Sequence, residues 1–161
     1  LGGASVGDHD LVRKVLGQDG LELDFWRIAM RPGKPLIFGS IGETPMMGMP
    51  GNPVSSLVCG IVYLRPAVRA MLGLDPHAAS QTARLGQDLP GNDLRQDYLR
   101  ATASLNEDGE TVVTPFDKQD SSMLSRLAKA DCLILRAPHA DPAKAGERVE
   151  ILPLSGETTG I

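Results

Sequence analysis

The sequence predicts an α/β domain followed by a small all-β barrel, with the change between them near residue 75. Three observations support this order. Strand-like and helical segments are mixed up to Leu72, and the segment 74–77 has the composition of a linker. From Ala78 onward, short strand-like segments are separated by turn residues, as in small barrels or sandwiches. We therefore expect domains over residues 1–74 and 75–161.

The first domain is expected to begin with a helix and to continue with strands. Apolar residues have helical spacing between Asp8 and Leu16, where Asp8 is placed as the N-cap. Gly17 marks the end of this helix. Alternating apolar residues then predict strands over residues 21–30, 35–38 and 46–49.

A long apolar helix is expected to close the first domain. Asn52 is placed to cap it, Pro53 suits its first turn, and the apolar run extends from Val54 to Leu72. Pro66 lacks an amide hydrogen, so we expect a kink or a local break there.

The second domain is expected to consist of strands with one short helix. The helix is predicted over residues 122–130, and the segment 106–109 has the composition of a hairpin loop. The predicted strands cover residues 82–85, 98–105, 110–114, 131–135 and 148–152.

Composition excludes several classes of protein. Apolar residues make up 42% of the 161 residues and charged residues 22%, which is typical of a soluble globular protein. A net charge of -4 argues against a general nucleic-acid binder. Cys59 and Cys132 lie in apolar segments without metal-ligand spacing, which favours core thiols and a reducing cytosol. The longest apolar run within the predicted helix, residues 54–64, stops at Arg65 and is too short to span a membrane.

The first candidate binding segment is the glycine-rich turn Gly2–Asp8, directly before the expected helix. Such a turn directs amide groups and a hydroxyl toward an oxyanion above the helix N-terminus. A tight strand-to-helix connection without a ligand fits the same residues equally well. Because the chain opens at Leu1 without an initiator methionine, we expect a buried strand upstream of it.

The second candidate segment carries three cations around a rigid turn. In the expected strand, alternation sends Arg27 and Arg31 to one side, and Lys34 returns toward them after Pro32 and Gly33. Guanidinium and ammonium groups in this arrangement suit a pyrophosphate or a tetrahedral oxyanion. The alternative is a solvated basic edge that discourages strand pairing. The same alternation places Trp26 on the opposite side, in the core.

The third candidate segment, residues 48–56, is a strand end, a proline-bounded turn and a helix start. The hydroxyls of Ser55 and Ser56 and the free amides of the helix start suit a second anion contact. Helix capping alone explains the segment nearly as well. The three segments are expected to meet at one edge of the sheet, where open α/β sheets bind ligands.

The segments GGASVGDHD, FWRIAMRPGKP and MPGNPVSS, in this order, resemble the molybdopterin molybdenumtransferase family, bacterial MoeA and the E-domain of gephyrin. Residues 98–100 and 119–122 look more loosely like the barrel at the end of that family. The resemblance implies the second half of a MogA-like, three-layer α/β/α molybdopterin-binding domain, followed by a barrel like MoeA domain IV.

The resemblance also implies an activity. The family inserts molybdenum from molybdate into adenylylated molybdopterin and releases AMP, with a divalent cation such as Mg²⁺, as a cytoplasmic homodimer. Tungstate fits the same cationic cradle. Because the amino-terminal domains and half of the pterin-binding domain are absent from this sequence, the chain alone is expected to be inactive.

Site residues follow from the positions that match the family. Asp10 is the expected metal ligand and, with Arg31 and Lys34, the expected catalytic set. Lysine is common in the family where Arg27 and Arg31 stand, which changes the geometry of anion contact. The expected substrate-binding residues are Gly2, Gly3, Ser5, Gly7, Arg27, Pro50, Gly51, Asn52, Pro53, Ser55, Ser56, Arg100, Ser121 and Ser122.

Two other functions fit parts of the sequence. Pterin adenylyltransferases share the glycine turn, but they lack the barrel expected here. A scaffold of gephyrin type would dimerise and bind a receptor peptide. Expected partners are small-molecule substrates, a second copy of the chain and an adenylyltransferase of the same pathway; nucleic acid and membrane are not expected.

Overall fold

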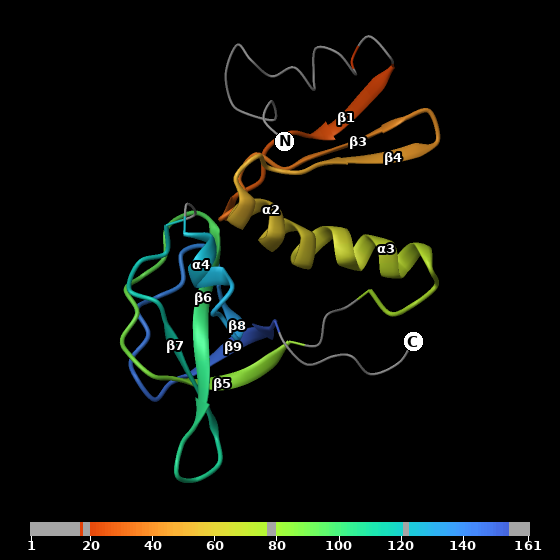
Figure 1. Ribbon diagram of the computed structural model, residues 1–161. Coiled ribbons are helices and arrows are strands. Elements are labelled where there is room, and N and C mark those ends of the chain that lie inside the picture. Colours follow the sequence, from red (N-terminus) through yellow and green to blue (C-terminus); the bar gives the residue numbers. More distant parts are fainter. Residues whose placement is uncertain (1–16, 18–19, 77–79, 121–122, 155–161) are drawn as a thin grey trace. The chain divides into compact units, whose positions relative to one another are not determined.

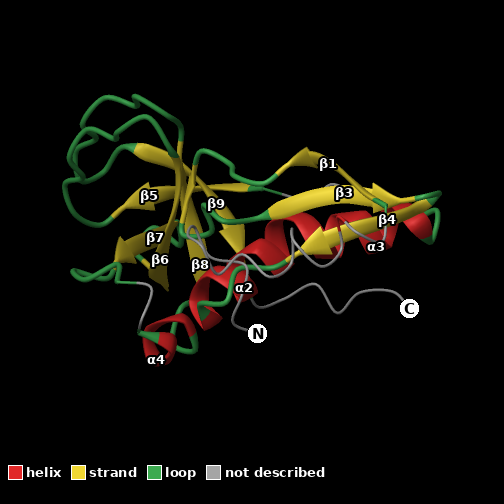
Figure 2. Cartoon of the chain, turned by 90° about the horizontal axis from the view of Figure 1, so that it is seen from above, coloured by secondary structure: helices red, strands yellow, loops and turns green. Residues whose placement is uncertain are grey.

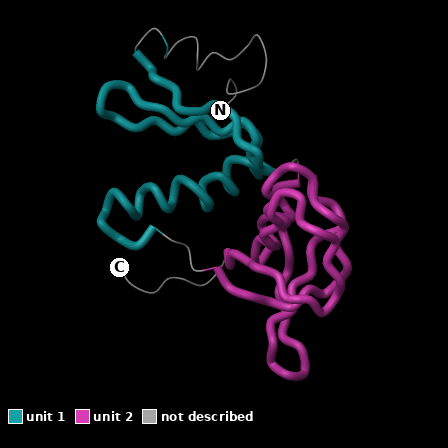
Figure 3. The backbone as a smooth tube through the Cα atoms, turned by 180° about the vertical axis from the view of Figure 1, so that it is seen from behind, with its two compact units in different colours: residues 1–77 teal, residues 78–161 magenta. Residues whose placement is uncertain are grey.

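The computed structural model describes residues 17, 20–76, 80–120 and 123–154. The chain divides into two compact units, residues 1–77 and 78–161 (Figure 3). The predicted glycine turn and the predicted helix over residues 8–16 lie outside the described residues.

The first unit contains a three-stranded antiparallel sheet in the order β1-β3-β4. Its strands are β1 (Leu21–Phe25), β3 (Ile37–Ile41) and β4 (Thr44–Gly48). β3 and β4 form a hairpin around Gly42, which has a φ of 57°. One long helix runs along a face of this sheet (Figures 1 and 2), and Val54 and Val58 of the helix are fully buried.

The predicted strand over residues 21–30 is wrong in its second half. β1 ends at Phe25 after a register shift, and Met30–Arg31 forms a separate short strand, β2. Phe25 stacks on Phe38 with ring centroids 5.8 Å apart. The alternation slips at the two adjacent aromatic residues, so Trp26 remains 37% exposed instead of entering the core. The prediction that Trp26 packs in the core is therefore wrong.

The long helix begins where the sequence predicts. The Asn52 side chain accepts a hydrogen bond from the amide of Ser55 at 3.1 Å, and Pro53 occupies the first turn. The helix comprises α2 (Pro53–Cys59), a five-residue π-helical turn, η1 (Gly60–Leu64), and α3 (Arg65–Met71).

The break expected at Pro66 takes the form of this π turn. The amide of Arg65 donates to the carbonyl of Gly60, five residues earlier, directly before the proline that has no amide hydrogen. The helix therefore continues past Pro66 and ends at Met71, close to the predicted end at Leu72. The helix has 19 residues with a mean hydropathy of 1.3, so it is long and apolar enough to cross a membrane. Core helices of soluble proteins meet the same criteria of length and composition.

The second unit is a closed five-stranded barrel (Figure 1). Its strands follow the order β6-β7-β5-β9-β8, and β8 pairs with β6 to close the sheet. The strands are β5 (Gln81–Leu85), β6 (Gln96–Leu105), β7 (Thr111–Pro115), β8 (Cys132–Arg136) and β9 (Arg148–Pro153). All five coincide with the strands predicted from the sequence, within a few residues.

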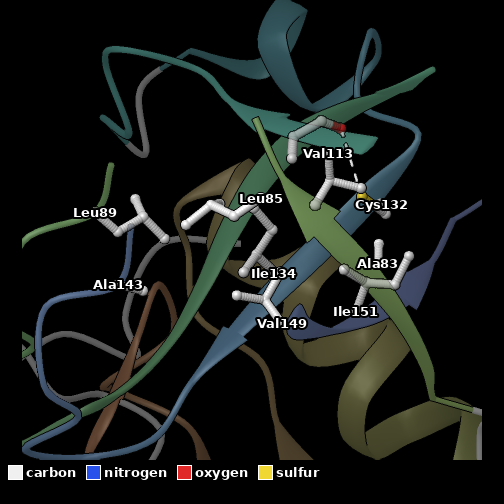
Figure 4. Close-up of a cluster of buried hydrophobic side chains, with 10 residues drawn as sticks. Ala83, Leu85, Leu89, Val113, Cys132, Ile134, Ala143, Val149 and Ile151 are labelled. Carbon is white, nitrogen blue, oxygen red and sulfur yellow. Dashed lines mark hydrogen bonds between the residues drawn. The ribbon is translucent and has the colours of Figure 1, made fainter. Parts of the chain in front are cut away.

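Aliphatic side chains and one thiol fill the barrel (Figure 4). Val113 and Ile134 are fully buried, and the Cys132 thiol donates to the carbonyl of Ala101 at 3.9 Å. Both cysteines are free and buried, as predicted. The expected hairpin loop joins β6 to β7, closed by the amide of Asn106 donating to Glu110.

The predicted helix over residues 122–130 is shorter in the structure. Within the described residues 123–130, only α4 (Leu124–Leu127) is helical, and Leu127 is its one buried residue. From Ala128 the chain turns back toward the barrel, where the amide of Asp131 donates to the carbonyl of Ala101. Because α4 buries only one side chain, tertiary packing gives little stabilisation to a longer helix.

Candidate oxyanion site in the first unit

Two cations flank a buried turn between β2 and β3. Arg31 and Lys34 are exposed, whereas Pro32 and Gly33 between them are buried. The amide of Leu36 donates to the carbonyl of Gly33 at 3.1 Å, which closes the turn. We refer to residues 31–34 as the cationic turn.

A second hydrogen bond ties the preceding segment to the cationic turn. The amide of Ile28 donates to the carbonyl of Lys34 at 3.0 Å, so the backbone of residues 28 and 34 is adjacent. Arg27 is therefore the residue directly before Ile28, whose backbone lies beside that of Lys34. Its guanidinium lies 4.0 Å from the ring centroid of Trp26, a cation–π contact. The strand alternation that was expected to unite Arg27 and Arg31 does not exist, because no strand spans residues 26–29.

The cationic turn packs directly against α2. A Cβ at Gly33 would lie 2.5 Å from the sulfur of Cys59 and 3.0 Å from that of Met30. Only glycine fits this position, which also has a φ of 120°. The side chains of Cys59 and Met30 thus lie directly behind the turn, a contact that no local sequence pattern indicates.

The register of β3 and β4 brings the third candidate segment beside the cationic turn. Ile37 pairs with Gly48, so the turn before Ile37 and the loop after Gly48 leave the same end of the hairpin (Figure 1). That loop, residues 49–52, leads into α2 and contains the buried Pro50. The two segments therefore meet, and they do so through the open end of an antiparallel hairpin.

The electrostatics of this end of the hairpin favour an anion. The first turn of α2 has no acidic residue, and the helix N-terminus carries partial positive charge. Lys34 forms no ion pair with a residue in the described ranges. Ser55 is only 6% exposed, whereas Ser56 is half-buried and better placed to reach a ligand. Such a set of cations, amides and a hydroxyl can bind and orient a tetrahedral oxyanion.

The barrel contains one buried cation among the predicted site residues. Arg100 is fully buried, and its Nε and Nη1 make no hydrogen bond with any described residue. Its Nη2 lies 3.5 Å from the carbonyl oxygen of Asp120, and Gln119 bonds to both its backbone amide and carbonyl. Burial lowers the pKa of the Arg100 guanidinium, repulsion by Arg126 acts in the same direction, and Asp120 opposes them.

Several predicted residues lie outside the described part of the chain. They include the only predicted metal ligand, Asp10. The others are Gly2, Gly3, Ser5, Gly7, Ser121 and Ser122. Within the described ranges, no three His, Cys, Asp or Glu residues are grouped so as to hold a metal ion.

Comparison with known protein families gives one match for each of the two units. Residues 1–70 match the family described as a probable molybdopterin binding domain, and residues 82–154 match the MoeA C-terminal region, domain IV. The molybdopterin molybdenumtransferase of Haemophilus influenzae is 34% identical over 160 residues, which is 96% of this chain. The chain belongs to the MoeA family.

The relatives are much longer than this chain. The chain spans 38% of the Haemophilus influenzae protein. It also covers 25% of the Drosophila melanogaster molybdenum cofactor synthesis protein cinnamon, with 34% identity over 152 residues. The chain therefore corresponds to a part of each MoeA relative.

A solved structure supports the fold. The MoeA protein of Pyrococcus horikoshii superposes with a TM-score of 0.73 at 27% identity, over 91% of this chain and 35% of that one. This likeness confirms the predicted order of a MogA-like α/β domain and a small barrel. The match to MoeA domain IV accounts for the barrel, which was not expected in a pterin adenylyltransferase.

Proposed function

We propose that this chain supplies the molybdate site and part of the pterin site of a molybdopterin molybdenumtransferase. The reaction inserts molybdenum from molybdate into adenylylated molybdopterin and releases AMP. The observation that carries the proposal is the cationic turn, with Arg31 and Lys34 exposed beside the start of α2. The names of the relatives support the assignment to molybdenum-cofactor biosynthesis.

The chain acts mainly by electrostatic positioning. Arg31 offers a planar fork to two oxygens of an oxyanion, and Lys34 adds a mobile ammonium. The loop 49–52 and Ser56 fix the opposite side of the ligand. Holding molybdate against the dithiolene lowers the entropic part of the barrier, and the cations stabilise charge on the departing phosphate.

Other residues are proposed as substrate contacts on separate grounds. Arg100 has two guanidinium nitrogens without a described partner, which an anionic substrate would satisfy. Ser121 and Ser122 are proposed together with Arg100, because they follow Asp120 in the sequence. The glycine turn at residues 2–7 and Pro53 complete the proposed pterin contacts.

The proposal includes a divalent cation, with Asp10 as a ligand. When bound, Mg²⁺ supplies charge neutralisation at the phosphoanhydride. The described residues contain no group of three His, Cys, Asp or Glu side chains that could hold the ion. We also propose cytoplasmic location, a homodimer, an adenylyltransferase partner, and domains over residues 1–74 and 75–161.

AMP release from adenylylated molybdopterin with molybdate tests the function. The enzyme is a chimera in which this chain replaces the corresponding part of the Haemophilus influenzae relative. We expect Arg31→Gln and Lys34→Gln each to lower AMP release at least about tenfold, the usual cost of a lost charge-assisted contact. Arg65→Gln, which removes an exposed cation of α3, serves as the matched control. Equal activity of all three variants would exclude the cationic turn as the oxyanion site.

A further inference from the structure

The thiol of Cys59 fills the space directly behind the cationic turn. Cys59 is fully buried, and its sulfur lies 3.9 Å from the carbonyl oxygen of Gly33, to which it donates. A Cβ at Gly33 would approach the same sulfur to 2.5 Å. The thiol and the turn are thus in direct contact, without room for an additional atom between them.

Cys59 belongs to a rigid part of the first unit. Asn52 caps the N-terminus of α2, and the helix is anchored by the fully buried Val54 and Val58. Ser55 lies one helical turn before Cys59 on the same face, close to the loop 49–52. The thiol is therefore held in place by an anchored helix at the point where it contacts the turn.

The positions of Arg31 and Lys34 depend on the contact between Cys59 and Gly33, because both cations are joined to Gly33 through the backbone of the turn. Arg31 and Lys34 stand on either side of the buried pair Pro32 and Gly33. Any displacement of Gly33 moves both charges relative to the loop 49–52. Bidentate contacts to an oxyanion tolerate little displacement, because the donors must meet the oxygens at hydrogen-bond distance.

We infer that Cys59 is a positioning residue for the oxyanion: its side chain holds the cationic turn at the correct distance from the start of α2. This inference rests on the proposed function, since it assigns the turn a ligand. The thiol does not react. Burial raises its pKa to about 12, so the nucleophilic thiolate is scarce at neutral pH.

Cys132 provides a matched control for a buried thiol with no such role. It is 1% exposed, and its sulfur lies 3.9 Å from a carbonyl oxygen, that of Ala101. Its neighbours are the aliphatic residues of the barrel core. Removal of either sulfur leaves a similar small cavity, but only Cys59 contacts the cationic turn.

Amide hydrogen exchange tests the positioning without any ligand. The amides of Leu36 and Ile28 donate to Gly33 and Lys34, so their exchange reports on the closed turn. We expect Cys59→Ala to speed exchange of these two amides by about tenfold or more relative to amides of β3, by local opening. Cys132→Ala should leave both amides unchanged. Unchanged exchange in a folded Cys59→Ala protein would overturn the inference.

Molybdate affinity tests the functional consequence. We expect Cys59→Ala to weaken molybdate binding about tenfold, because the cations are misplaced although none is removed. Cys59→Ser restores most of the volume and should restore most of the affinity. If Cys59→Ala fails to fold, Cys59→Val, which adds volume against the turn, is expected to weaken molybdate binding as well. Cys132→Ala should bind as the original chain does.

The two proposals fail in different ways. Faster exchange with unchanged molybdate affinity in Cys59→Ala would overturn the positioning role while leaving the site itself standing. No molybdate binding by the original chain or by the chimera would overturn the proposed function, and the positioning role with it.

Discussion

Glycine occupies several positions of the first unit where an added side chain would approach a neighbouring atom too closely, and Gly33 and Gly39 are the two tightest. At Gly33 the obstacle is the sulfur of Cys59, a side-chain atom. At Gly39 a Cβ would lie 2.2 Å from the carbonyl oxygen of Glu22, which is backbone of the neighbouring β1. The second contact cannot relax without separating two paired strands, because Glu22 and Gly39 lie at adjacent positions of the β1–β3 ladder.

Gly39→Ala is therefore expected to destabilise the first unit. The added methyl group forces β1 and β3 apart, at a cost of about 1–3 kcal/mol in the free energy of unfolding. Urea denaturation followed by Trp26 fluorescence measures this loss. Gly42→Asn is the control, because Gly42 has open space and asparagine tolerates its positive φ. Equal stability of the two variants would contradict the account of Gly39.

Single residues also show how far the sequence was informative. Asn52 and Pro53 were predicted as the cap and first turn of α2, because both roles depend on local backbone chemistry. Trp26 was misplaced, because its environment depends on where β1 ends. Gly33 was identified as a turn residue, but its contact with Cys59 joins positions 26 residues apart and leaves no local signal.

At the scale of elements, an ion-pair network ties three parts of the barrel together. Glu110, which precedes β7, accepts from Arg84 of β5 at 3.1 Å and lies 3.6 Å from Arg148 of β9. The Arg84 guanidinium also donates to the carbonyl of Gly146. The hydrogen bond from Arg84 lowers the pKa of Glu110 below its ordinary value of 4.5.

This network makes barrel stability dependent on pH. Because the pKa of Glu110 is lower in the folded state, its contribution is complete above pH 4.5 and is lost as the pH falls through the folded pKa. We expect Glu110→Gln to reduce the fall in unfolding free energy on acidification across that range. The measurement is urea denaturation at a series of pH values, with Glu150→Gln, an exposed residue of β9, as control. An identical acid response of Glu110→Gln and the original chain would refute the role of this pair.

Elements of the barrel were easier to predict than those of the first unit. Five short strands with clear turn residues between them give a period-two pattern that survives in the structure. The segment 21–31 combines a register shift, adjacent aromatic residues and a cationic loop, and its pattern reads as one strand. The π turn before Pro66 was predicted only as a break, since periodicity does not distinguish a π turn from a kink.

At the scale of the whole molecule, the order of motifs along the chain identified the family, and the matches to both units confirm it. The arrangement of the candidate site was harder to predict. The sequence suggested convergence at one edge of an open α/β sheet, whereas the described strands bring two segments together through the β3–β4 hairpin. The pairing register of the β3–β4 hairpin places the cationic turn beside the start of α2.

Calorimetric titration with molybdate tests the central claim most directly, namely that the cationic turn and the start of α2 form its site. The titration uses this chain and the chimera, at low and high salt. We expect binding that weakens with salt and is lost in Lys34→Gln, because Lys34 has no described ion-pair partner and faces the ligand as a point charge. Arg65→Gln should bind normally. Molybdate binding of the chimera that is undiminished in Lys34→Gln would contradict the claim.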